Sequence, residues 1–137
     1  MNSNYKELFA KALNARDNAY APYSRFKVGA CVLMKDGKMF TGCNVENASF
    51  GATNCAERTA IFKAISEGYE AGDFDKLLVL GDTDGLCYPC AICRQVMNEF
   101  FEKDSEIIVC NTKGDYKVYR FEELLPYAFE KEDLGNV

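Results

Sequence analysis

The sequence predicts an α/β fold in three layers, in which helices cover a mixed five-stranded sheet. The expected elements run in the order helix, two strands, helix, strand, helix, two strands. Helices interspersed in this way must cover a sheet, which excludes a helix bundle or a β-sandwich. The 137 residues fit one domain, so we expect a single domain over 1–137. A chain of this size buries roughly two thirds of its unfolded surface and needs no disulfides to fold.

The first element is a predicted helix over residues 4–19. An apolar stripe at helical spacing supports it, formed by Tyr5, Leu8, Phe9, Ala12 and Ala19. Asn4 and Glu7 are spaced as a capping pair at its start. The run Ala21-Pro22-Tyr23-Ser24 ends the helical pattern. Strands over 27–34 and 39–44 follow, and Asp36-Gly37 between them predicts a hairpin.

The second half of the chain begins with a polar loop over 45–54. A helix over 55–66 follows, with Gly68 as its stop signal. Pro89 suits the first turn of a third helix, because its missing N–H costs nothing there. Three short segments, over 76–80, 106–110 and 116–120, predict the remaining strands. A helical turn over 121–125 follows the last of them.

Charge and hydropathy restrict the partners. The net charge is -5 and no basic run is present, which argues against a nucleic acid and favours a small, weakly charged substrate. The apolar stretches are strand-sized, so we expect no contact with a membrane. The first residues lack the layout of a signal peptide, which predicts a cytoplasmic protein.

The most informative feature is a pair of cysteine motifs in a chain with seven cysteines and no histidine. The motifs are Cys55-Ala56-Glu57 and Pro89-Cys90-Ala91-Ile92-Cys93, and each opens a predicted helix. In a reducing compartment, such cysteines are more often metal ligands or catalytic groups than disulfide partners. Three thiolates can hold Zn²⁺ and leave its fourth position open, as in catalytic sites. Cys31 and Cys110 lie in apolar runs and are expected to pack as small hydrophobes.

Nearby side chains complete a catalytic site. A zinc ion with three thiolates is a weak activator of water, because the site is negative. Helix N-termini and the guanidinium groups of Arg58 and Arg94 can withdraw that charge. Glu57 can then move protons, as in the zinc nucleobase deaminases, whose signature is His or Cys, one residue, Glu, then Pro-Cys-x-x-Cys. On a cytosine ring, zinc hydroxide would attack C4, and Glu57 would protonate N3 and then the leaving amino group.

Two alternative interpretations of the cysteines carry less weight. A structural zinc site would use the same thiols but has no need of Glu57. A redox motif of the thioredoxin kind would need no third cysteine and belongs to a different strand order.

Four motifs together resemble the cytidine deaminase family, in its small homotetrameric form with three cysteine ligands. They are Tyr23-Ser24-x-Phe26-x-Val28-Gly29-Ala30, Gly42-Cys43-Asn44-Val45-Glu46-Asn47-Ala48, Thr53-Asn54-Cys55-Ala56-Glu57-Arg58 and Pro89-Cys90-x-x-Cys93-Arg94-Gln95. The resemblance covers about residues 5 to 130. It implies zinc on the three motif cysteines and deamination of cytidine and deoxycytidine to uridine and deoxyuridine, a step of pyrimidine salvage.

The same resemblance implies the residues that bind the nucleoside. Asn44 and Glu46 would hydrogen-bond the ribose 3′-hydroxyl, Phe26 would pack at the substrate, and the backbone of Ala56 would contact the ring. Phe129 matches an aromatic residue that reaches the pocket of a neighbouring subunit, which implies a homotetramer.

Two positions depart from the family pattern. Ala91 stands where glycine is usual, and Tyr88 stands where a small hydroxyl residue is common. Two other functions are possible in the same fold. Deamination of a modified cytosine nucleoside is disfavoured by Asn44 and Glu46, the pair expected to bind ribose. Editing of a polynucleotide is disfavoured by the acidic net charge. The pattern does not rank cytidine against deoxycytidine, since both carry the 3′-hydroxyl.

Overall fold

The structure is a computed structural model that describes residues 1–135, so the last two residues of the expected domain lie outside it. Its sheet has five strands in the order β2-β1-β3-β4-β5. β3 and β4 are parallel and the other neighbouring pairs are antiparallel, which confirms the predicted mixed sheet. The strands are β1 (Val28–Met34), β2 (Met39–Cys43), β3 (Phe74–Gly81), β4 (Glu106–Asn111) and β5 (Tyr116–Arg120).

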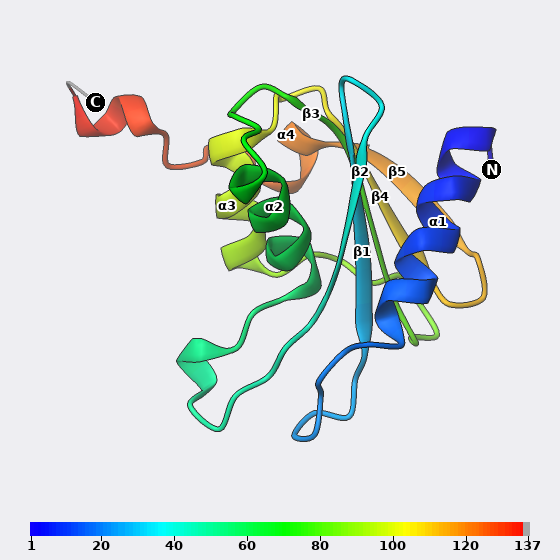
Figure 1. The fold of residues 1–137 in the computed structure, drawn as a ribbon. Helices are drawn as coiled ribbons and strands as arrows, with labels where there is room; N and C mark the ends of the chain where they lie inside the picture. Colours follow the sequence, from blue (N-terminus) through cyan, green and yellow to red (C-terminus); the bar gives the residue numbers. More distant parts are fainter. Residues whose placement is uncertain (136–137) are drawn as a thin grey trace.

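Helices cover both faces of this sheet and give the expected three layers. α1 (Ser3–Arg16) lies on one face, and α2 (Ala56–Ser66) and α3 (Ala91–Phe100) lie on the other (Figure 1). The short helix α4 (Phe121–Leu124) follows β5. The C-terminal segment then leaves the body beside α3 and ends in the 3₁₀ turn Lys131–Leu134 (Figure 1).

The two faces of β1 supply two separate parts of the core, because alternate side chains of a strand point to opposite faces. Ala30 and Val32 pack with residues of α2 and α3. Cys31 and Leu33 pack with α1, in a cluster that also contains Cys110. Cys31 and Cys110 are fully buried, as expected for cysteines that act as small hydrophobes.

Gly42 brings α2 close to β2. A Cβ atom at this position would lie 2.4 Å from the carbonyl oxygen of Ala56 and 2.5 Å from the amide nitrogen of Ala60. Only glycine therefore allows the first turn of α2 to rest on the strand. This contact sets the position of the helix end that carries Cys55 and Glu57.

The helix ends differ from the sequence-based expectation in three places. Asn2, rather than Asn4, caps α1, because its side chain accepts the N–H of Tyr5 at 2.9 Å. α1 ends at Arg16 instead of residue 19, because Tyr20 turns away to pair with Val45. Pro89 precedes α3 and does not lie in its first turn, because Cys90 is the capping residue. No helix of the described residues is both long and apolar enough to cross a membrane.

Candidate functional site

The three motif cysteines meet where α2 and α3 begin. Cys55 is the N-cap residue of α2, Cys90 is that of α3, and Cys93 lies in the first turn of α3. Their sulfur atoms all lie within 4.8 Å of one another, and the Sγ atoms of Cys55 and Cys90 are 3.7 Å apart. The crossover from α2 through β3 to α3 therefore brings together thiols that the sequence separates by 35 residues.

This spacing fits a zinc ion. Thiolates about 2.3 Å from a tetrahedral zinc lie about 3.8 Å from each other, which matches the Cys55–Cys90 separation. The Sγ atom of Cys90 also accepts the backbone N–H of Cys93 at 3.4 Å, so the helix end turns its partial positive charge toward the sulfurs. Three thiols at one site can hold the metal and leave a fourth position for water or substrate.

Arg58 is placed to stabilise a thiolate. Its Nη2 atom donates a hydrogen bond to the Sγ atom of Cys55 at 3.2 Å. A hydrogen bond from the Cys93 thiol, together with the charge of Arg58, lowers the pKa of Cys55 to about 5. The same hydrogen bond raises the pKa of Cys93. Of these two thiols, Cys55 is therefore the one with the lowered pKa and ionises more readily near neutral pH.

Arg94 makes other contacts. Its Nε atom donates to the carbonyl oxygen of Pro89 and its Nη1 atom to that of Leu124, both at 2.8 Å. These bonds join the residue before Cys90 to the end of α4. The guanidinium of Arg94 thus supports the segment that carries a candidate ligand.

Glu57 is the buried acid of the site. It lies in the first turn of α2 and its exposure is 4%, which is unusual for a carboxyl group. Burial raises its pKa to about 7. A carboxyl group with a pKa near neutrality can both accept and return a proton, which is what general acid–base catalysis requires.

A cavity of about 240 Å³ connects these groups with the expected substrate residues. Its lining includes seven residues singled out from the sequence: Phe26, Asn44, Glu46, Cys55, Ala56, Glu57 and Cys90. It also includes Ser24, Val28, Thr53, Cys87 and Tyr88, to which sequence reasoning gave no role in the site. Ser24, Val28 and Thr53 stand in the motifs quoted above, and their closeness in sequence to the assigned residues is the signal that could have identified them.

Asn44 and Glu46 are tied to the backbone of the preceding turn. The side chain of Asn44, only 8% exposed, accepts the N–H of Val28 and donates to the carbonyl oxygen of Phe26, each at 2.8 Å. Glu46 accepts the N–H of Tyr23 at 3.0 Å and that of Ser24 at 3.1 Å. Both residues therefore hold the segment that presents Phe26 to the cavity.

Phe129 lies apart from the site of its own chain. Its side chain is 57% exposed, and it does not appear among the described residues that line the cysteine-bearing cavity. Its carbonyl oxygen accepts hydrogen bonds from Gln95 at 3.0 Å and Asn98 at 3.2 Å, which fix the C-terminal segment beside α3. The exposed ring is thus free to contact another molecule.

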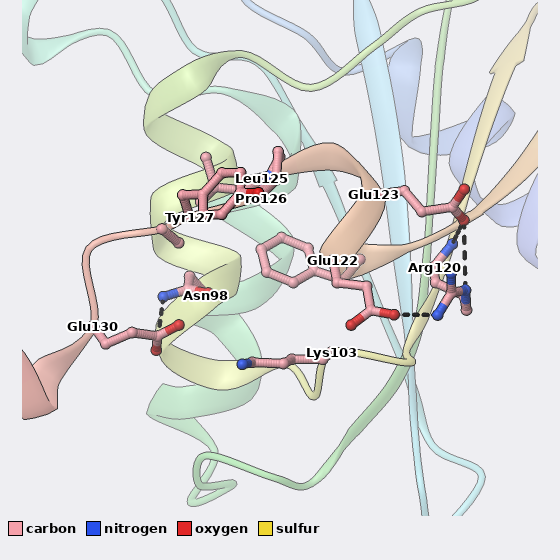
Figure 2. A pocket seen from close by; sticks show the side chains of 11 residues that line it. Asn98, Lys103, Arg120, Glu122, Glu123, Leu125, Pro126, Tyr127 and Glu130 are labelled. Carbon is pink, nitrogen blue, oxygen red and sulfur yellow. Dashed lines mark hydrogen bonds and ion pairs between the residues drawn. The ribbon is translucent and has the colours of Figure 1, made fainter.

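A second hollow of about 510 Å³ lies between the end of α3, α4 and the C-terminal segment (Figure 2). Arg120 forms ion pairs with Glu122 and Glu123 along its rim, and Asn98 donates to Glu130 at 3.3 Å (Figure 2). None of the residues that line this hollow is a cysteine, and all of them belong to the described part of the chain. The metal-binding chemistry therefore belongs to the smaller cavity.

Comparisons with known proteins agree with this geometry. The family model described as "Cytidine and deoxycytidylate deaminase zinc-binding region" matches residues 2–110. A cytidine deaminase of Halalkalibacterium halodurans is 50% identical over 129 residues, which cover 94% of this chain and 96% of that protein. One of Sporosarcina psychrophila is 47% identical over 130 residues, covering 95% and 94%. A crystal structure of cytidine deaminase from Burkholderia pseudomallei gives a TM-score of 0.89 at 50% identity, covering 94% of this chain and 100% of that chain. The chain therefore belongs to the cytidine and deoxycytidylate deaminase family.

Proposed function

We propose that the protein is a zinc-dependent hydrolase that converts cytidine and deoxycytidine, with one water, to uridine and deoxyuridine and releases ammonia. The observation that carries the proposal is the buried carboxyl of Glu57 in the same cavity as Cys55 and Cys90, with Cys93 completing the thiol cluster. The family and the relatives named cytidine deaminase support the substrate.

Cys55, Cys90 and Cys93 would hold the zinc. When bound, zinc supplies a Lewis acid that makes water acidic enough to attack at neutral pH. Arg58 withdraws charge from the Cys55 sulfur through its hydrogen bond. Without that withdrawal, three thiolates would leave the site too negative for the task.

Glu57 moves the protons of the reaction. Its carboxylate accepts a proton from the attacking water and delivers it to N3. It then accepts the second proton of the former water from the new C4 hydroxyl and delivers it to the exocyclic nitrogen, which leaves as ammonia while C4 becomes a carbonyl. Burial brings its pKa to about 7, so both directions of transfer are accessible near neutrality. Its place in the first turn of α2, two residues after Cys55, fixes the carboxyl beside the thiol cluster.

The remaining lining residues place the nucleoside. The ring of Phe26 packs on the substrate, the backbone of Ala56 contacts the base, and Asn44 with Glu46 contacts the sugar 3′-hydroxyl. The lining of the cavity combines cysteine sulfurs with an aromatic ring and polar side chains, which suits a nucleoside whose base and sugar are chemically different. A purely structural zinc protein would have no use for Glu57 and would avoid a buried acid.

The working form is proposed to be a cytoplasmic homotetramer. The exposed Phe129, on a segment that leaves the body of the chain, supports a site completed by a neighbouring subunit (Figure 1). The finding that no described helix can cross a membrane is consistent with this location.

One experiment tests the function. Purified protein is incubated with cytidine, deoxycytidine and free cytosine, and the ultraviolet change and ammonia release are followed while zinc is measured by elemental analysis. We expect about one zinc per chain and turnover of both nucleosides in preference to cytosine. A metal content near zero, or no turnover of either nucleoside by the zinc-loaded protein, would refute the proposal.

A further inference from the structure

Ser24 connects two residues of the cavity through one hydroxyl group. Its Oγ atom donates a hydrogen bond to the Oε2 atom of Glu46. The same Oγ atom accepts the backbone N–H of Phe26 at 3.0 Å. All three residues line the cysteine-bearing cavity. The hydroxyl of Ser24 is therefore the bond that links the carboxylate to the backbone of the aromatic residue.

The turn that carries Ser24 needs such a support. Arg25 has a φ of 58°, in the left-handed region that residues with a Cβ atom seldom adopt. Backbone in that region persists when surrounding contacts determine it. The contacts come from two sides, since Asn44 binds the backbone at Phe26 and Val28, and Glu46 binds it at Tyr23 and Ser24.

The hydrogen bonds also define what Glu46 can offer a ligand. A carboxylate has about four acceptor positions. Three are used by the hydroxyl of Ser24 and by the backbone N–H groups of Ser24 and Tyr23. These bonds, that of the Ser24 hydroxyl first, lower the pKa of Glu46 and keep it ionised. About one acceptor position remains, which suits a single hydroxyl donor.

We propose that Ser24 is a positioning residue for nucleoside binding, which aligns Glu46 and Phe26 together. The proposal rests on the proposed function, in which Glu46 meets the sugar hydroxyl and Phe26 packs on the substrate. Because one hydroxyl serves both contacts, its removal misaligns the sugar contact and the ring contact in one step. Thr53 and Cys87 also line the cavity, but neither joins two substrate-contacting residues in this way.

The first test compares Ser24→Ala with Ser24→Thr, which restores a hydroxyl. A hydrogen bond to a charged group, when lost, corresponds to about a tenfold change or more. We expect Ser24→Ala to lower kcat/KM for cytidine about tenfold, mostly through KM, and Ser24→Thr to recover most of it. Ser49→Ala is the matched control, since Ser49 lies in the neighbouring loop, is exposed and lines neither the cysteine-bearing cavity nor the hollow of Figure 2.

A double-mutant cycle separates positioning from a general structural effect. In a Glu46→Ala background, Ser24→Ala should cost only about two- to threefold in kcat/KM, because the alignment of the carboxylate is already lost. Binding of uridine, followed by thermal shift, should show the same pattern without any turnover. Zinc content of Ser24→Ala should equal that of the Ser49→Ala control, and its melting temperature should be only slightly lower, because the two hydrogen bonds lost lie in an exposed turn.

The outcomes divide cleanly. If the parent protein fails to deaminate cytidine, the proposed function is wrong. The role of Ser24 is then tested by uridine binding to the parent, the two single variants and the double variant. If the parent is active and Ser24→Ala costs the same factor with and without Glu46, the positioning role is overturned. A kcat/KM for Ser24→Ala within twofold of the parent value overturns it as well.

Discussion

Arg58 donates a hydrogen bond from its Nη2 atom to the Sγ atom of Cys55 at 3.2 Å, within the first turn of α2. One short helical segment therefore carries a candidate metal ligand, the proton-transfer group Glu57 and the cation that stabilises the ligand as a thiolate. Groups that contact metal ligands in this way are commonly worth a factor of 10–100 in affinity or activity.

Replacing Arg58 by alanine should weaken both zinc binding and deamination. The thiolate of Cys55 would lose a charge-assisted hydrogen bond, so we expect roughly a 10–100-fold loss in zinc affinity or in kcat/KM. Competition with a chromogenic chelator measures the first quantity and steady-state kinetics the second. Arg120→Ala, which removes an exposed guanidinium paired with Glu122 and Glu123, is the control and should change neither. Parent-like values in Arg58→Ala would contradict the assigned role.

Replacing Glu57 by alanine should abolish deamination and leave the metal bound. The group transfers protons and is not one of the three clustered thiols, so its loss should cost at least roughly 10²–10⁴-fold in kcat. Glu57→Gln keeps the shape and should be impaired similarly. Elemental analysis of the same samples supplies the control. A variant without the carboxyl that turns over cytidine near the parent rate would show the mechanism to be wrong.

Truncating Asn44 should affect stability as well as substrate binding. Its side chain satisfies the N–H of Val28 and the carbonyl oxygen of Phe26, and a buried group left without a partner costs about 1–3 kcal/mol. We expect Asn44→Ala to lower the melting temperature and to lower kcat/KM for both cytidine and a 3′-deoxy analogue. Glu46→Ala should also lower kcat/KM for both substrates, because Glu46 holds the same turn, but the loss should be larger for cytidine, which alone carries the 3′-hydroxyl. Identical substrate profiles for the two variants would argue against this division.

Acid should weaken the contact between α1 and β4. The hydrogen bonds from Lys76 and Tyr5 to Glu106 hold the pKa of that carboxyl below its usual range. A group with a lowered folded-state pKa contributes stability above its unfolded value, about 4.3, and loses it as the pH falls through the folded value. The stability difference between the parent and Glu106→Gln, from urea unfolding, should therefore be present at pH 7 and shrink below about pH 4. A difference that is constant over this range would contradict the linkage.

Mixing two inactive chains should restore activity if sites are shared between subunits. Glu57→Ala and Phe129→Ala chains are co-refolded, and some mixed sites then take Glu57 from one chain and Phe129 from another. The rescue is detectable only if Phe129→Ala strongly lowers activity. Loss of a base-stacking contact worth roughly 1–3 kcal/mol would have an effect of that size. Light scattering at the assay concentration gives the oligomeric state. A fully active monomer would refute the shared site.

The sequence predicted the sheet and the cysteine cluster because both depend on local signals. Asp36-Gly37 specified the hairpin, and Gly37 indeed has a φ of 93°. The two cysteine motifs each opened a helix, and helices that begin at the same edge of a sheet bring their first residues together.

Other features depended on contacts that no local pattern encodes. The guanidinium of Arg94 binds the carbonyl oxygen of Leu124, 30 residues away, which only the packing of α3 and α4 determines. Asn2 and Asn4 are equivalent as caps by residue type, and the fold selects Asn2 through the N–H of Tyr5. The hydroxyl of Ser24 bonds both Glu46 and Phe26 because Arg25 adopts a left-handed conformation in the same turn. An arginine in the sequence gives no sign of that conformation.

The separation of Cys55 and Cys90 by 35 residues has a consequence for unfolding. An ion held by both would act as a reversible cross-link around the α2–β3–α3 crossover, and opening that loop would first require the ion to be released. The lifetime of the folded chain would then depend on the free zinc concentration of its surroundings. A chelator would shorten that lifetime, and the metal content of a preparation would determine how long it survives heating.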